Sequence, residues 1–261
     1  MKVAAKLRSA TAVPKKVDTR EDIASSARTA LVISVVATMI LYLTPGLDFI
    51  AYPLMLLSTL VHEMGHGIGG IVAGGEWLDF HMFSDGSGYA RTYAPSSIGM
   101  AFLCAAGLVG PALIAAVYLV LGQRPRIARI ALGATGAFFA ISLVLWVRGG
   151  FGMAFVAVVA ALCLAIAVLA SAETSRLVLL FLATQLALSA YSRGDYLFDD
   201  YVDGQMTDGK LAPSDVQIMS DFIGGPYWFW GIVCGAFSIA VIAFGAWLYL
   251  RPTKSSPIAK L

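Results

Sequence analysis

Long apolar segments of about 20 residues dominate the chain and alternate with short polar connections. An α-helix rises 1.5 Å per residue, so a segment of about 20 apolar residues crosses the hydrocarbon core of a bilayer. The pattern therefore predicts an all-α, polytopic transmembrane helix bundle of about six to seven spans. The apolar segments lie at residues 30–49, 51–73, 97–121, 128–147, 149–171, 175–193 and 226–249.

Charged residues concentrate outside these segments. Residues 1–28 are rich in lysine and arginine, and the positive-inside rule makes them a cytoplasmic N-terminal tail. We assign residues 29–250 to the transmembrane domain and residues 251–261 to a C-terminal tail. Seven complete spans would put the two termini on opposite sides of the membrane. The C-terminal tail is also basic, which is explained if one span is re-entrant or broken.

The composition is that of a protein embedded in a lipid bilayer along most of its length. Hydrophobic residues make up 59% of the chain and charged residues 13%, whereas about 25% of a soluble domain is charged. The net charge of +2 gives no indication of nucleic-acid binding. The three cysteines lie in apolar segments without C-x-x-C spacing, which predicts buried apolar side chains rather than disulfides or metal ligands. They are Cys104, Cys163 and Cys234.

The second apolar segment contains the sequence His62-Glu63-Met64-Gly65-His66. On a helix, an H-E-x-x-H motif places two imidazoles on one face, where both can bind one zinc ion. Glu63 between them is then positioned to act on a zinc-activated water as a general base. The alternative is that these are satisfied core histidines or polar groups that pack helices. Polar side chains at membrane depth are costly and usually mark function, which favours the metal site.

The first long polar connection, residues 74–97, contains Asp85-Gly86-Ser87-Gly88 followed by alternating residues up to Tyr93. An Asp-Gly turn followed by alternation is typical of a hairpin. We therefore predict a short hairpin or edge strand over Gly86–Tyr93, after the metal-binding helix. The alternative is an ordinary connecting loop.

The second long polar connection, residues 192–224, is rich in aspartates that are mostly expected to be solvated loop charges. Ser214-Asp215 after Pro213 has the pattern of an N-cap that begins a short helix, and Gly224 or Gly225 would end that helix. The seven aspartates are Asp195, Asp199, Asp200, Asp203, Asp208, Asp215 and Asp221.

With these motifs the chain resembles the site-2 protease family of intramembrane zinc metallopeptidases, in its compact, bacterial-type branch. The resemblance implies a helical bundle that holds zinc within the bilayer, in the inner membrane of a bacterial cell. It also implies cleavage near or inside a transmembrane segment of a membrane-protein substrate. The matching residues are Val61–Gly67, Asp85-Gly86-Ser87-Gly88, Gly107–Leu113, and Ser214-Asp215 with Gly224-Gly225-Pro226.

A catalytic zinc ion needs a third protein ligand besides His62 and His66. The position of a third histidine in a metzincin is Val72, and the one other histidine, His81, lies in the hairpin connection. The carboxylates that follow the sixth apolar segment are the remaining candidates. We predict Asp195, which is closest to membrane depth and matches an aspartate of the family near the end of the penultimate span. Asp199, one helical turn farther, and Asp200 are the reserve candidates.

The resulting hypothesis is a zinc metalloendopeptidase with Glu63 as the catalytic base. The residues Gly86, Ser87, Gly88 and Tyr89 are predicted to bind an unwound, extended substrate by adding it as a strand. Two other functions are compatible with the motif. One is a non-proteolytic metal-binding scaffold, and the other is a transporter whose intramembrane histidines and glutamate relay ions.

Overall fold

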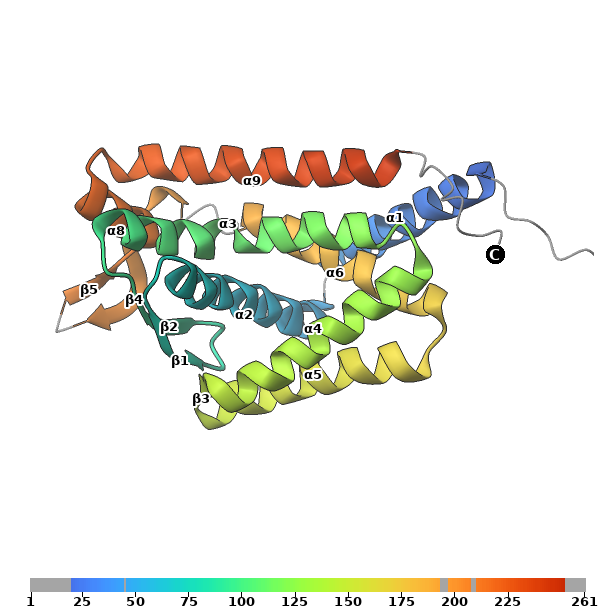
Figure 1. Ribbon diagram of the computed structural model, residues 1–261, viewed down its shortest axis with the longest axis horizontal. Coiled ribbons are helices and arrows are strands. Elements are labelled where there is room, and N and C mark those ends of the chain that lie inside the picture. Colours follow the sequence, from blue (N-terminus) through green and yellow to red (C-terminus); the bar gives the residue numbers. More distant parts are fainter. Residues whose placement is uncertain (1–19, 45, 193–196, 208–209, 252–261) are drawn as a thin grey trace, which may run out of the picture.

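The long helices lie side by side in one bundle in the computed structural model, which describes residues 20–44, 46–192, 197–207 and 210–251 (Figure 1). The all-α, polytopic fold expected from the apolar segments is confirmed. A short helix, α8 (Asp215–Ile223), precedes the last long one. The long helices are α1 (Arg20–Leu43), α2 (Asp48–Val72), α3 (Ser97–Leu121), α4 (Pro125–Leu145), α5 (Gly150–Leu169), α6 (Ala172–Ser192) and α9 (Tyr227–Leu250).

Four of these helices, α3, α4, α5 and α9, are both long enough and apolar enough to cross a membrane. The helices α1, α2 and α6 have 24, 25 and 21 residues, which is sufficient length at 1.5 Å per residue. Each of them also includes polar or charged side chains. In α2 these include the H-E-x-x-H motif, so the residues that lower its apolarity are the ones that carry the candidate chemistry.

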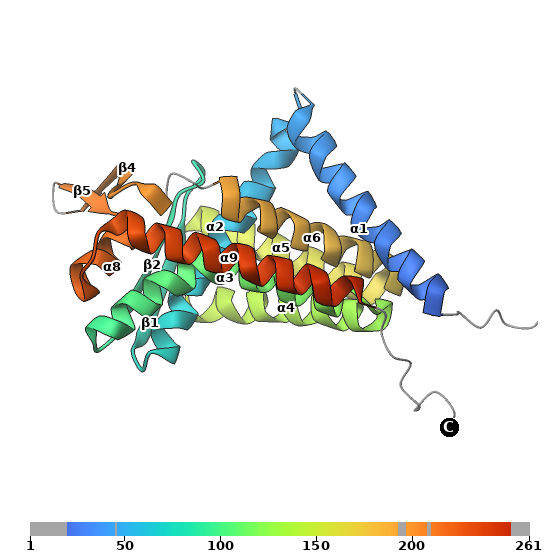
Figure 2. The same ribbon diagram turned by 90° about the horizontal axis from the view of Figure 1, so that it is seen from above.

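The helices α1 and α2 together pass once along the bundle (Figures 1 and 2). Ala30, in the first half of α1, packs with Leu119 and Tyr249, which lie near the ends of α3 and α9. The end of α2 lies at the opposite end of the bundle, where Val72 leads into a hairpin. The chain thus enters α1 and leaves α9 at the same end, in agreement with the expectation that one apolar segment is not a separate complete span.

The expected hairpin after α2 is confirmed. The strands β1 (Glu76–Met82) and β2 (Gly88–Tyr93) pair in antiparallel fashion, and β3 (Val147–Arg148) adds to β1 in parallel, in the order β2-β1-β3. Gly86, with a φ of 91°, lies in the turn between the strands, where a residue without Cβ adopts positive φ at little cost.

The hairpin is fixed by one charged pair across its strands. Arg91 Nε donates a hydrogen bond to Asp79 Oδ1 at 2.7 Å, and a second guanidinium nitrogen contacts the other carboxylate oxygen. The Arg91 guanidinium holds the pKa of the Asp79 carboxyl below its usual range. Because a bidentate pair restricts both side chains, it keeps β1 and β2 in register.

The second polar connection is more ordered than the sequence indicated. The strands β4 (Tyr201–Thr207) and β5 (Lys210–Pro213) form a two-stranded antiparallel sheet where we expected mainly loop. The short helix predicted after Pro213 is confirmed as α8. Ser214 Oγ accepts a hydrogen bond from Gln217 N at its start, and Gly224, with a φ of 77°, follows its last residue.

Glycines allow the helix that carries the motif to pack closely against its neighbours. A Cβ on Gly65 would lie 2.4 Å from the carbonyl oxygen of Ala106, so α2 and α3 approach backbone to backbone. A Cβ on Gly67 would lie 2.2 Å from the indole of Trp77, so β1 packs directly against α2 at this glycine. Close packing of small residues is a main source of helix association in membranes. It places α3 and the hairpin around the motif.

Candidate metal centre

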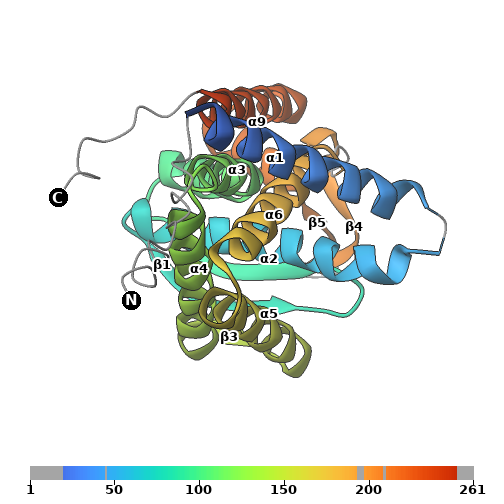
Figure 3. The ribbon, with the colours of Figure 1, turned by 90° about the vertical axis from the view of Figure 1, so that its right-hand side faces the viewer.

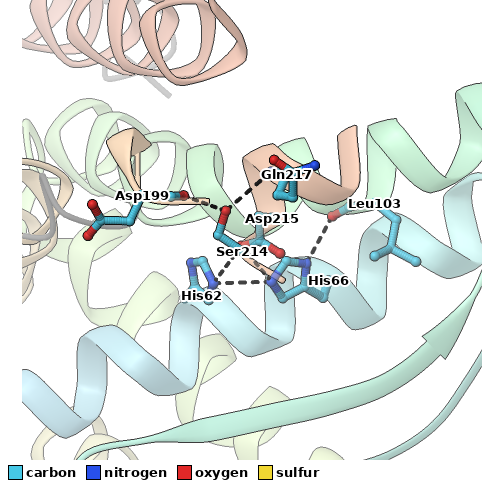
Figure 4. A network of polar contacts seen from close by, with 7 residues as sticks. All are labelled: His62, His66, Leu103, Asp199, Ser214, Asp215 and Gln217. Carbon is cyan, nitrogen blue, oxygen red and sulfur yellow. Dashed lines mark hydrogen bonds and ion pairs between the residues drawn. The ribbon is translucent and has the colours of Figure 1, made fainter. Parts of the chain in front are cut away.

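The two histidines of the motif lie one turn apart on α2 and point in the same direction (Figure 4). Their Nε2 atoms are 3.1 Å apart, and both side chains are buried. Glu63, the residue after His62, is also buried. The predicted geometry of the H-E-x-x-H helix is therefore present, with two imidazole nitrogens converging on one point.

Asp215 completes this cluster from a distant part of the chain. Its Oδ2 atom lies 3.2 Å from His62 Nε2 and 3.3 Å from His66 Nε2. Asp215 is the first residue of α8, and the capping residue Ser214 fixes the start of that helix (Figure 4). Ser214 Oγ donates a hydrogen bond to the Asp199 carbonyl oxygen at 2.6 Å and accepts one from Gln217 N at 3.2 Å. These bonds hold the carboxylate over the imidazoles.

The three donor atoms have the spacing that a zinc ion requires. Zinc–nitrogen and zinc–oxygen bonds of about 2.0–2.2 Å in a tetrahedral site place neighbouring ligand atoms roughly 3.4 Å apart. The observed separations are 3.1, 3.2 and 3.3 Å. Among the residues that the structure describes, His62, His66 and Asp215 are the one group of three such side chains that meets at a point. The donor set of two imidazoles and one carboxylate is one that catalytic zinc sites use.

The orientation of His66 also suits metal binding. Its Nδ1 atom lies 3.1 Å from the carbonyl oxygen of Leu103 on α3. A carbonyl oxygen only accepts hydrogen bonds, so Nδ1 carries the proton, and the lone pair of neutral His66 is on Nε2. That lone pair faces the Asp215 carboxylate, and a cation between these two electron-rich atoms would stabilise both. A second hydrogen bond of this kind typically orients a metal-binding histidine.

Gly107 on α3 lies directly against His66. A Cβ added at Gly107 would be 2.1 Å from His66 Cε1 and 2.3 Å from its Nε2. At Gly110, one turn later on the same helix, the nearest atom to an added Cβ is the Gly65 Cα at 3.6 Å. The first contact is impossible without movement of the ring, whereas the second is an ordinary van der Waals contact.

We therefore expect Gly107→Ala to displace the His66 imidazole and to lower zinc affinity by at least the roughly 10–100-fold seen when an outer-shell partner of a metal ligand is removed. Gly110→Ala is the matched control, with zinc affinity near that of the wild type. Competition against a zinc-chelating dye on purified protein measures both. Equal affinities for the two variants would contradict the placement of His66 against α3.

The predicted third ligand, Asp195, lies outside the described residues. The two reserve candidates, Asp199 and Asp200, both have exposed side chains. Their backbone carbonyl oxygens accept hydrogen bonds from Ser214. The structure brings Asp215 to the two histidines. A signal for this residue was present in the sequence, since the Ser214 cap fixes Asp215 in the first turn of a helix, but nothing local indicated what that turn faces.

A cavity of about 220 Å³ opens beside the metal centre. Its lining includes Glu63 of α2, Gly88 and Tyr89 of β2, and Val202 of β4. Of the four residues predicted to contact substrate, Gly88 and Tyr89 thus line the cavity.

The other two, Gly86 and Ser87, belong to the turn that α2 holds in place. Thr59 Oγ1 on α2 donates a hydrogen bond to the Gly86 carbonyl oxygen at 2.8 Å. The turn is further anchored by Tyr52, whose hydroxyl donates to the Ser84 carbonyl oxygen at 2.5 Å. His81 lies on β1, where it stacks on Tyr89 with ring centroids 4.9 Å apart.

Comparison with known proteins agrees with this architecture. The family model of the Peptidase M50B-like proteins matches residues 31–245, from α1 to near the end of α9. The chain therefore belongs to the Peptidase M50B-like family, a domain of the site-2 protease type. No curated protein and no solved structure matches the chain. Family membership and the apolar helices together make the protein a membrane protein of a peptidase family.

Proposed function

We propose that this protein is an intramembrane zinc metalloprotease that hydrolyses peptide bonds of membrane-protein substrates. The observation that carries the proposal is the convergence of His62, His66 and Asp215 beside Glu63, in a cavity bordered by an edge strand. A zinc ion at such a site supplies an activated water at neutral pH and polarises the scissile carbonyl.

Each residue of the centre has a distinct role in the proposed reaction. The Nε2 atoms of His62 and His66 and the Oδ2 atom of Asp215 would hold the zinc ion, which would supply the activated water. Glu63 takes a proton from the attacking water, whose oxygen bonds to the carbonyl carbon. When the C–N bond breaks, Glu63 passes that proton to the leaving amide nitrogen.

The edge strand β2 is suited to hold an extended peptide. Phe80 on β1 pairs with Ala90, and the Phe80 N–H donates instead to the Trp146 carbonyl oxygen, on the side away from β2. Since hydrogen-bonded and non-hydrogen-bonded pairs alternate in an antiparallel ladder, the N–H and C=O of Ala90 point away from β1. Within the described residues β2 pairs with β1 alone. Ala90 lines the cavity, so its backbone groups are placed to pair with a substrate strand.

Ala90→Pro is therefore expected to reduce cleavage while zinc content stays unchanged. Proline removes the outward N–H, and one net hydrogen bond of about 0.5–1.5 kcal/mol corresponds to a loss of roughly 2- to 12-fold in kcat/KM. The pairing of β2 with β1 does not use this N–H, so the hairpin persists. Ala90→Ser keeps the N–H and serves as the control. Cleavage by the proline variant at the rate of the serine variant would remove strand addition at Ala90 from the mechanism.

The two rival functions lead to different experimental results. A metal-binding scaffold would bind zinc without turnover, and a transporter would move ions without a structural need for one zinc per chain. Purified protein is incubated with a panel of tagged single-span membrane proteins, with 1,10-phenanthroline and then with added zinc. If the protein is a zinc protease, we expect cleavage that the chelator abolishes and added zinc restores. Zinc binding with no cleavage of any panel member, or of any membrane protein in cells, would favour the scaffold.

A further inference from the structure

Beside the metal centre, the cavity has an apolar wall to which two helices contribute. The helix α2 lies between α3 and the β1–β2 hairpin (Figures 1 and 3), and α8 lies over its histidines (Figure 4). Met100, Leu103 and Cys104 of α3 line the cavity, and so does Ile218 of α8. Leu103 and Cys104 are buried in one apolar cluster, against which Met100 and Ile218 pack while partly exposed. The accessible part of the wall is therefore formed by Met100 and Ile218.

Each of these two residues lies one helical turn from a group of the metal centre. Ile218 is three residues after Asp215 on α8, and residues three apart are neighbours on a helix surface. Met100 is three residues before Leu103 on α3, and the Leu103 carbonyl oxygen lies 3.1 Å from His66 Nδ1. A peptide held at the metal would therefore contact both side chains close to the bond that is cut.

Charge in the cavity is concentrated at the metal centre. The ionisable groups there are His62, Glu63, His66 and Asp215, and the other described residues that line the cavity are uncharged. A charged substrate side chain placed against the apolar wall would lose its water without gaining an ionic partner, and this desolvation costs free energy. The wall therefore disfavours charged residues beside the cleaved bond.

The cavity is also small. Its volume of about 220 Å³ is below the roughly 300–1,000 Å³ of pockets that take up drug-sized ligands. The attacking water and the scissile peptide group must share this space with the side chain next to the cleaved bond. The remaining space suits an aliphatic side chain better than an aromatic ring.

We propose that Met100 and Ile218 form a specificity subsite, which selects substrates with an aliphatic residue from alanine to leucine in size next to the cleaved bond. This inference rests on the proposed protease function and names the substrate class of the same site. One methylene more or less in an apolar pocket changes kcat/KM by roughly 10- to 200-fold. Shortening either side chain should therefore change which residues the protein accepts.

Specificity is measured on one single-span membrane protein that the wild type cleaves. The residues on the two sides of the cut bond are changed, one at a time, to alanine, leucine, phenylalanine or aspartate. At one of the two positions, we expect the phenylalanine and aspartate substrates to be cleaved at least about 10-fold less efficiently than the alanine and leucine substrates. Met100→Ala and Ile218→Ala should each raise the kcat/KM ratio of phenylalanine to alanine at least about 10-fold, and Ile218→Val should raise it less.

Phe102→Ala is the matched control on α3. Phe102 is exposed and lines a different cavity, between α2, α3 and α4, so the ratio should stay at the wild-type value. A variant that only weakened the fold would lower kcat/KM for all substrates alike. An unchanged ratio in both Met100→Ala and Ile218→Ala would overturn the proposal, as would efficient cleavage of the aspartate substrates by the wild type.

A second measurement needs no turnover and separates the subsite from the protease function. The photocrosslinker p-benzoylphenylalanine takes the place of Met100, or of Phe102, in full-length Glu63→Gln protein, which is irradiated with the panel of tagged single-span proteins. We expect crosslinks to aliphatic stretches of panel proteins from position 100 and none from position 102. Such crosslinks without cleavage of any panel member by the wild type would refute the protease function and leave the subsite standing. Absence of crosslinks from position 100 would overturn the subsite, whether or not cleavage occurs.

Discussion

Replacing Glu63 by glutamine is expected to lower the rate of peptide hydrolysis by about 10²–10⁴-fold, the usual contribution of a positioned general base. Glutamine has nearly the same shape as glutamate but does not take up the proton of the attacking water. Glu63 is next to His62 on α2 and lines the cavity, but it is not one of the three clustered donors. Zinc content and folding should therefore match those of the wild type.

The measurement compares wild-type and Glu63→Gln protein in the same cells. Quantitative proteomics of the membrane fraction would detect fragments with new termini inside transmembrane segments, and metal analysis of the purified proteins would give zinc per chain. Uncut substrate should accumulate with the variant. If the variant turned over substrate at the wild-type rate, Glu63 would have no part in the mechanism, and loss of zinc from the variant would instead make Glu63 a ligand.

Asp215→Ala is expected to abolish stoichiometric zinc binding and, with it, cleavage. Removal of an outer-shell partner typically costs 10–100-fold in metal affinity, and loss of one of three protein ligands should exceed that. The variant leaves His62 and His66 in place on α2, so the helix bundle should still assemble. Zinc titration of purified protein measures the effect.

Asp221→Ala is the matched control, because Asp221 lies on the same helix with an exposed side chain that accepts a hydrogen bond from Gln217. It should bind zinc like the wild type. The same titration on Asp195→Ala and Asp199→Ala tests the candidates that the sequence favoured. Full zinc occupancy in Asp215→Ala, combined with loss in Asp195→Ala, would show that the third ligand is the one predicted from the sequence.

The helices and the first hairpin were predictable because each depends on a local pattern. Apolar segments of sufficient length marked α2, α3, α4, α5, α6 and α9 to within a few residues, and the Asp85-Gly86 turn with alternation marked β2. The helix α1 was placed less well, because it begins at Arg20, inside the predicted tail, and ends at Leu43. The histidine pair was equally predictable, since the spacing between His62 and His66 fixes its geometry on any helix. Ser214, as an N-cap residue, likewise marked the start of α8.

The partner of the histidine pair was not predictable from local patterns. The expected depth in the membrane favoured Asp195, because Asp195 directly follows an apolar segment. Asp215 lies farther along the same polar connection, after the β4–β5 hairpin. That hairpin was missed because its aspartates and glycines weaken the alternation typical of strands. Which carboxylate meets the imidazoles depends on how α8 docks on α3, and contacts between elements so distant in the chain leave no periodic signal.

Zinc K-edge X-ray absorption on the wild-type protein, purified in detergent, would identify the atoms that bind the metal. We expect one zinc per chain with two imidazole nitrogens at about 2.0–2.1 Å and carboxylate or water oxygens at about 2.0–2.2 Å. No sulfur should be bound, although Cys104 lines the same cavity. Absence of zinc from the wild-type protein, or a sulfur ligand at about 2.3 Å, would contradict a centre built from His62, His66 and Asp215.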